Sequence, residues 1–464
     1  MAKNVTRDLT TGSPMKLVLG FLLPLLGGLL FQQFYSMVDT VIVGKFLGVD
    51  ALAGVGSTGS INFLVLGFCI GIASGFVIPV SQKFGERDES GLRRYVANSA
   101  WLSAAFAVVI TVATCLLCGS ILTWMHTPEE IFQYAYDYIF IIFLGIPVTI
   151  LYNLLSGIIR SLGDSKTPIY FLVLSSVLNV ILDILSVTVL HMGVSGPAWA
   201  TVISQGVSGF LCLAIMGKRY EILRMKPEEW RPNRYHLVRL AGMGIPMGLQ
   251  YSITAIGSIV IQTAVNDLGA LYVASVTAAV KVSQLFVCPF DAMGTTMAVY
   301  GGQNYGAMKL DRIGKGVRAC VLLAVAYSAV AFLALWLFGD SLAMLFVDAK
   351  EPLEIQQAIA ANAGKFLFWN SLFYVPLALV NILRFMIQGL GFTRQAVFAG
   401  VFEMVARGFI GFCLVPAVGY IAVCLANPSA WIMADLFLIP AYLYDLGKLK
   451  RRFRRQQPAD ISLS

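Results

Sequence analysis

The residues of this sequence that could do chemistry are acids placed inside long apolar stretches. Asp39 lies in the apolar stretch 21–48, and Asp183 lies in a second one four residues after Asn179. A carboxylate in the middle of a membrane span costs about 2.5–3.5 kcal/mol on insertion scales, and acids found there usually have a function. Taking up and releasing a proton or a sodium ion is the chemistry that would offset this cost.

The spacing predicts that the two acids lie at a similar depth. Asp39 precedes Lys45 by six residues, about 9 Å along a helix, and Asp183 precedes His191 by eight residues, about 12 Å. Two nearby acids in a low dielectric cannot both ionise at low cost, so such a pair should bind a proton readily. Asn179 shares a helix face with Asp183, and its amide oxygen adds a ligand that a small cation accepts.

Two further residues of the first apolar stretch bear on Asp39. Tyr35 stands one turn before it and can hydrogen-bond the same cluster. Pro24 stands several turns before it, where proline removes a backbone hydrogen bond and permits a kink. That kink either responds to protonation of Asp39 or is fixed and inert. The structural alternative for Asp39 and Asp183 is that each carboxylate only satisfies a neighbouring polar group.

The composition predicts a polytopic membrane protein with an all-α fold. Of 464 residues, 58% are hydrophobic and 12% are charged, whereas soluble domains carry about 25% charged residues. Twelve stretches are long enough to cross a bilayer, which takes about 20 apolar residues. They are 16–44, 51–81, 95–121, 132–159, 167–190, 195–217, 238–266, 271–301, 316–338, 357–388, 395–416 and 418–446.

The distribution of basic residues predicts the orientation. With the N-terminus inside, 28 of the 33 Lys and Arg residues fall on inside segments, Arg384 among them, and only Lys45 and Lys350 fall outside. This bias is the positive-inside rule, so both termini are expected to be cytoplasmic and the protein to lie in the cell membrane. The basic tail is then an anchor for topology and lipid headgroups, and a nucleic-acid partner is not expected.

An internal repeat organises the chain into two lobes. The charged segment 218–237 separates a lobe at 1–217 from a lobe at 238–447, and the basic tail 448–464 follows. The shift that places Gly48-Val49 on Gly269-Ala270 also places Gln82 on Gln303. Since each lobe has an even number of helices, we predict two six-helix bundles related by a pseudo-twofold axis along the membrane normal.

The second lobe has different intramembrane charges. It has no acid at the positions that align with Asp39 and Asp183, so the cation site is predicted to belong to the first lobe alone. Asp291, Asp435 and Glu403 are candidates for the substrate path. Glu403 and Arg407 are four residues apart and would most simply form an ion pair within one helix.

Several segments together give the chain a family resemblance. They are QQFYSMVDTVIVGKFLGVDALAGVGS, GFVIPVSQKFGERD, IRSLGDSKTP, LNVILD, GVSGPAWATVISQ and GGQNYGA. In these segments the chain resembles the multidrug and toxic compound extrusion (MATE) family, more its bacterial DinF-like branch than the eukaryotic one. The resemblance implies twelve helices in two lobes and antiport of organic cations against protons or sodium ions, without a cofactor.

The resemblance also implies site residues. The family's cation cluster looks like Asp39, Asn179 and Asp183, joined by Tyr35, Asn153 and Thr201, and its helix 1 proline looks like Pro24. Some NorM-like members carry an acid in helix 7, and this chain has none in MGLQYSITAIGSIVIQTAV, so a mechanism built on that acid does not transfer.

Two other classes of function are the alternatives. A flippase for lipid-linked precursors is the runner-up, but such a protein wants a cationic cavity, and the first lobe has no intramembrane Lys or Arg. A membrane enzyme is not expected, because no metal-ligand cluster or acid pair on a loop is present, and no P-loop points to ATP. Two lobes in one chain make a monomer sufficient.

Overall fold

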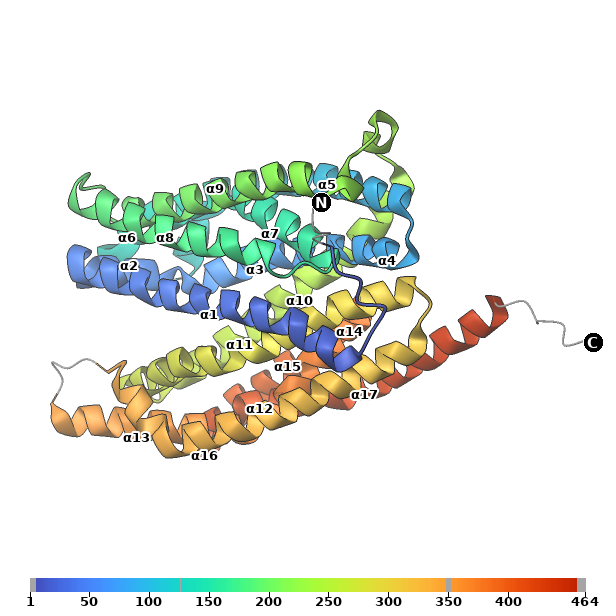
Figure 1. The fold of residues 1–464 in the computed structure, drawn as a ribbon. Coiled ribbons are helices and arrows are strands. Elements are labelled where there is room, and N and C mark those ends of the chain that lie inside the picture. Colours follow the sequence, from blue (N-terminus) through green and yellow to red (C-terminus); the bar gives the residue numbers. More distant parts are fainter. Residues whose placement is uncertain (1–5, 126, 348–351, 457–464) are drawn as a thin grey trace, which may run out of the picture. The chain divides into compact units, whose positions relative to one another are not determined.

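Residues 6–125, 127–347 and 352–456 are described by the computed structural model, apart from the side chains of residues 39–41, 44, 49, 455 and 456. All regular elements within these ranges are helices (Figure 1). In the first half they are α1 Pro14–Leu47, α2 Val49–Ser57, α3 Gly59–Phe76, α4 Ile78–Glu86, α5 Glu89–Trp124, α6 Glu129–Leu144, α7 Ile146–Ser161, α8 Thr167–Thr188 and α9 Ser195–Arg219.

The second half follows two short turns of 3₁₀ helix, η1 Glu221–Leu223 and η2 Pro227–Trp230. Its helices are α10 Arg234–Asp267, α11 Ala270–Gly306, α12 Leu310–Met344, α13 Leu353–Leu372, α14 Tyr374–Gly389, α15 Thr393–Phe409, the π-helical turn η3 Ile410–Leu414, α16 Val415–Val418 and α17 Tyr420–Gln456. The last of these continues through most of the basic segment that follows the final span.

These helices confirm the predicted twelve spans. In the described part of the chain, ten segments are long and apolar enough to cross a membrane, and two bent pairs complete the set. The pair α6 and α7 bends by 47°, and the pair α13 and α14 bends by 53°. The first bend follows Gly145, and Pro147 stands in the first turn of α7, where its missing N–H is tolerated.

The backbone turns confirm the internal repeat. Positive φ angles occur at Gly48 and Gly269, and again at Arg87 and Met308, and the two pairs have the same separation in the sequence. Two further pairs share a slightly longer separation: Gly163 with Gly391, and His191 with Gly419. A non-glycine residue at positive φ is uncommon, so the recurrence of this geometry at matching positions shows that both halves use the same turns.

The chain divides into two compact units. The first comprises Phe21–Phe84 and Asp88–Ala255 with the residues before Asp8, and the second comprises Asp8–Gly20, Gly85–Arg87 and the residues from Ile256 on. The first part of α10 thus packs with the first unit, and the first turns of α1 pack with the second.

Small residues explain how α10 joins the first unit. Gly71 and Gly75 of α3 face Gly244 and Gly248 of α10. A Cβ placed on Gly75 would lie 2.5 Å from the Gly244 Cα, and one on Gly71 would lie 2.6 Å from the Met247 carbonyl oxygen. The two backbones therefore touch, which is the packing that small residues four apart permit between membrane helices.

Candidate ion-coupling site

Helix α8 carries Asn179 and Asp183, and a buried carboxylate fixes its start. Asp164 Oδ1 accepts hydrogen bonds from the backbone N–H groups of Lys166 and Thr167, at 2.8 and 3.0 Å. The Tyr220 hydroxyl, just after α9, donates to Asp164 Oδ2 at 2.7 Å. The beginning of α8 is therefore tied to the end of α9.

Close packing keeps α8 against α9 along the membrane span. Ser208 Oγ on α9 donates to the Phe171 carbonyl oxygen on α8 at 2.9 Å. At the other end, Gly196 lies so near Ser186 that an added Cβ would come within 2.5 Å of the serine Oγ. The two helices lie side by side in Figure 1. This packing buries the polar face of α8.

Both polar residues of that face are buried. Asp183 is 0% exposed and Asn179 is 2% exposed. The Asn179 Nδ2 group lies 3.4 Å from Thr201 Oγ1 on α9, a long hydrogen bond. The Asn179 Oδ1 atom has no hydrogen-bond partner among the described residues. The structure thus brings Asn179 to Thr201, one helical turn from Asp183, and leaves one buried amide oxygen able to accept a further bond.

Asn153 belongs to a different polar contact. It lies on α7, and its Nδ2 group donates to the carbonyl oxygen of Thr149 at 2.8 Å within the same helix. The Thr149 hydroxyl donates to Gln205 Oε1 on α9 at 2.6 Å. This link between α7 and α9 was not predicted, because a threonine and a glutamine on separate helices leave no pattern in the sequence.

Helix α1 passes close to α8, but the key side chain lies outside the described part. A Cβ placed on Gly28 would lie 3.1 Å from Ile169 and 3.3 Å from Leu172, so the two helices approach closely there. Tyr35 is half-buried. α1 is a continuous helix through Pro24, which is also half-buried. The side chain of Asp39 is among those that the structure does not describe.

The second unit contains a buried ion cluster. Glu403 of α15 accepts from Arg407 Nη1 at 3.4 Å, which confirms the predicted pair within one helix. Glu403 also accepts a hydrogen bond from Arg384 of α14, and Arg407 Nε donates to Asn427 Oδ1 at 3.4 Å. Glu403 is 3% exposed.

Arg384 is a partner of Glu403 that the sequence did not predict. It was counted among the bases of the inside segments, and the structure shows it buried on α14 and bonded to Glu403. A charge count cannot show whether a base near the end of an apolar stretch has an acid beside it. The other candidates of this unit differ from each other, since Asp435 on α17 is buried and Asp291 on α11 is exposed.

This architecture is that of a multi-pass helical membrane protein: twelve spans in two repeated six-helix bundles, with a buried acid and amide on one span. Comparison with known proteins then identifies the family. The MatE family model matches residues 24–185 and again 246–413, once in each half of the repeat. The chain belongs to the MatE family of membrane transporters, and it is not an enzyme.

Individual relatives agree with this assignment. The chain is 28% identical to the probable multidrug resistance protein YpnP of Bacillus subtilis, over 84% of this chain and 85% of that protein. It is 30% identical to the probable multidrug resistance protein YoeA of the same organism, over 72% and 74%. The solved structure of an outward-facing multidrug resistance MATE family transporter has a TM-score of 0.89 at 22% identity, covering 97% of this chain and 99% of that one.

Proposed function

We propose that this protein is a secondary active antiporter that exports organic cations or drugs in exchange for protons or sodium ions by alternating access. The observation that carries the proposal is the buried carboxylate of Asp183 beside the open amide oxygen of Asn179. A buried acid in a span is costly unless it binds something, and these oxygens suit either a proton or a small cation. The relatives named as multidrug resistance proteins support drug export.

The helix register supports a pairing of Asp39 with Asp183. A Cβ placed on Gly28 of α1 would lie 3.3 Å from the Leu172 side chain of α8, so these two positions face each other. Asp39 follows Gly28 by the same number of residues as Asp183 follows Leu172. Both intervals correspond to about three helical turns, or about 16 Å along the helix axis. Spans one and five run in the same direction, so this register would put both acids at the same level.

The surroundings of the coupling step follow from this proposal. Thr201 and Tyr35 would lend polar groups to the cluster, Asn153 would join it only by leaving its bond to the Thr149 carbonyl oxygen, and Pro24 would let α1 respond to the occupancy of the cluster. Transport would need no cofactor, both termini would be cytoplasmic, and the monomer would be the working unit. The buried guanidinium groups of Arg384 and Arg407 are both engaged by Glu403, which counts against the cationic cavity that a flippase of anionic lipids would need.

The test is ethidium efflux from liposomes that contain the purified protein. Wild type is compared with Asp183→Asn and Asp39→Asn under an imposed proton gradient and, separately, an imposed sodium gradient. We expect efflux with one of the gradients and at least a tenfold loss in both variants. Asp50→Asn on the exposed start of α2 is the matched control and should transport normally. Wild-type rates in Asp183→Asn would refute the coupling role of α8.

A further inference from the structure

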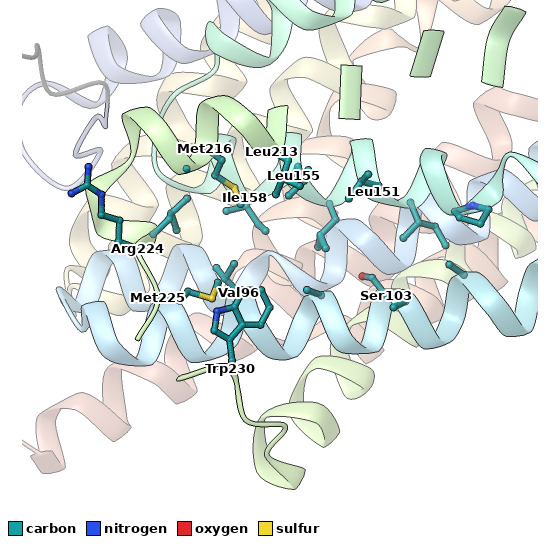
Figure 2. Close-up of a pocket in the computed structure, with 18 of the residues that line it drawn as sticks. Val96, Ser103, Leu151, Leu155, Ile158, Leu213, Met216, Arg224, Met225 and Trp230 are labelled. Carbon is teal, nitrogen blue, oxygen red and sulfur yellow. The ribbon is translucent and has the colours of Figure 1, made fainter. Parts of the chain in front are cut away.

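A pocket of about 710 Å³ lies in the first unit between α5, α7 and α9 (Figure 2). Its wall is almost wholly aliphatic, as shown by Val96, Leu151, Leu155, Ile158 and Leu213. Pockets of roughly 300–1,000 Å³ are the size that holds small ligands. None of its lining residues belongs to the proposed coupling site.

The segment that carries η1 and η2 lines one end of the pocket. Arg224, Met225 and Trp230 lie at this end (Figure 2). The Arg224 side chain is 66% exposed, and its ion pair with Glu221 is loose at 3.9 Å. Of the other two acids of this segment, Glu229 is bonded to Arg93 at 2.7 Å, and Glu228 is exposed in η2. The Arg224 guanidinium can therefore bind an anion.

The exposed surface beside the pocket is apolar as well. Val108 of α5, which lines the pocket, is 62% exposed, and Trp101 of the same helix is 52% exposed. Trp101 Nε1 donates to the Trp230 carbonyl oxygen at 2.9 Å, and Trp230 is itself 46% exposed. Tryptophan collects at the depth of lipid headgroups. This end of the pocket should therefore lie at the membrane surface, with the aliphatic part in the hydrocarbon.

We propose that this pocket is a binding site for an anionic phospholipid. An acyl chain lies along the aliphatic wall between α5, α7 and α9, and the headgroup phosphate pairs with Arg224 at the end of the pocket that Met225 and Trp230 also line. Charge complementarity selects the occupant: basic residues near a membrane surface attract anionic lipids, whereas a cationic drug would meet the guanidinium at the entrance. Bound lipid would join three spans to the segment that connects the two halves of the chain.

The experiment is a lipid titration of the purified full-length protein by native mass spectrometry. Phosphatidylglycerol is compared with phosphatidylcholine that has the same acyl chains. We expect wild type to retain phosphatidylglycerol preferentially and Arg224→Ala to weaken that binding about fivefold, as expected for one basic residue at an anionic surface. Arg231→Ala, an exposed base of the same segment outside the pocket, is the matched control and should bind as wild type does.

A second variant tests the aliphatic wall that would bind the acyl chain of the lipid. Ala104 lines the pocket from the exposed side of α5, so Ala104→Phe should fill it without disturbing the core, and binding of both lipids should fall at least fivefold. Equal retention of the two lipids by wild type, unchanged binding in both variants, or displacement of phosphatidylglycerol by ethidium would each overturn the proposal. The last of these results would assign the pocket to the transported cation.

Discussion

The substitution Glu403→Gln should expose how much the second unit depends on its buried ion cluster. Glu403 is the one carboxylate that the structure shows bonded to both Arg384 and Arg407, and each of the three residues is no more than 6% exposed. Glutamine keeps the shape of the side chain but removes its charge. Two buried guanidinium groups would then lose the anion between them.

The expected loss of stability follows from this geometry. Removing one partner of a buried ion pair costs about 3–5 kcal/mol, because the other charge stays buried. At roughly 2–4 °C per kcal/mol for a unit of this size, the melting temperature should fall by about 6–20 °C. The double substitution Glu403→Gln with Arg407→Met should recover part of the loss, since one of the two cations is then removed as well.

The assay can use the protein's own thiols. Six of the eight cysteines are buried: Cys69, Cys118, Cys212, Cys288, Cys320 and Cys424. A thiol-reactive fluorogenic dye therefore reports unfolding of the purified protein in detergent. Glu354→Gln, at an exposed position of α13, is the matched control and should change the stability by less than about 0.5 kcal/mol. A Glu403→Gln melting temperature equal to that of wild type would refute a structural role of the cluster, and Glu403 would then return as a substrate-path residue.

Three further predictions follow from other contacts. Gly75→Ala should destabilise the protein by about 1–3 kcal/mol, because the new Cβ meets the backbone of α10. Gly27→Ala on α1 is the control, since its new Cβ meets nothing within 4 Å and should leave the stability unchanged. Equal melting temperatures of the two variants would contradict the close packing of α3 on α10. Burial alone would raise the pKa of Glu229, but hydrogen bonds from Arg93 and from the Lys226 N–H lower that pKa overall. The Glu229–Arg93 pair therefore stabilises the fold at pH values above the unfolded pKa of about 4.3, and this contribution is lost as the pH falls through the lower folded pKa. The melting temperatures of wild type and Glu229→Gln should therefore differ at pH 7 and converge in acid, with exposed Glu221→Gln as the control; a constant gap would argue against the titration. Tyr220→Phe should cost about 1.5–3 kcal/mol, because Asp164 loses a 2.7 Å hydrogen bond from the hydroxyl, and an unchanged melting temperature would show that this bond does not hold α8 to α9.

The candidate site was predictable from sequence only as far as local spacing reaches. Asn179 and Asp183 are four residues apart in one apolar stretch, and that is enough to place them on the same helix face. Thr201 entered through the family resemblance, and the structure brings it to Asn179. The contact between Thr149 and Gln205 could not be predicted, because the packing of α7 against α9 creates it.

The number of spans and the repeat were determined by the sequence itself. A bilayer demands long apolar helices, and the inside bias of Lys and Arg orders them, so composition and charge carry this information directly. The matching turns at Gly48 and Gly269 were likewise legible as aligned glycines.

Only the tertiary structure decided which charges are buried together and which helix surfaces stay open. Arg384 is buried because Glu403 stands on the neighbouring helix, and nothing within α14 itself signals that partner. The pocket beside Arg224 arises where three separate helices leave a space that their side chains do not fill. Both features depend on contacts between residues far apart in the chain, and those contacts are set by helix packing, which leaves no period or spacing in the sequence.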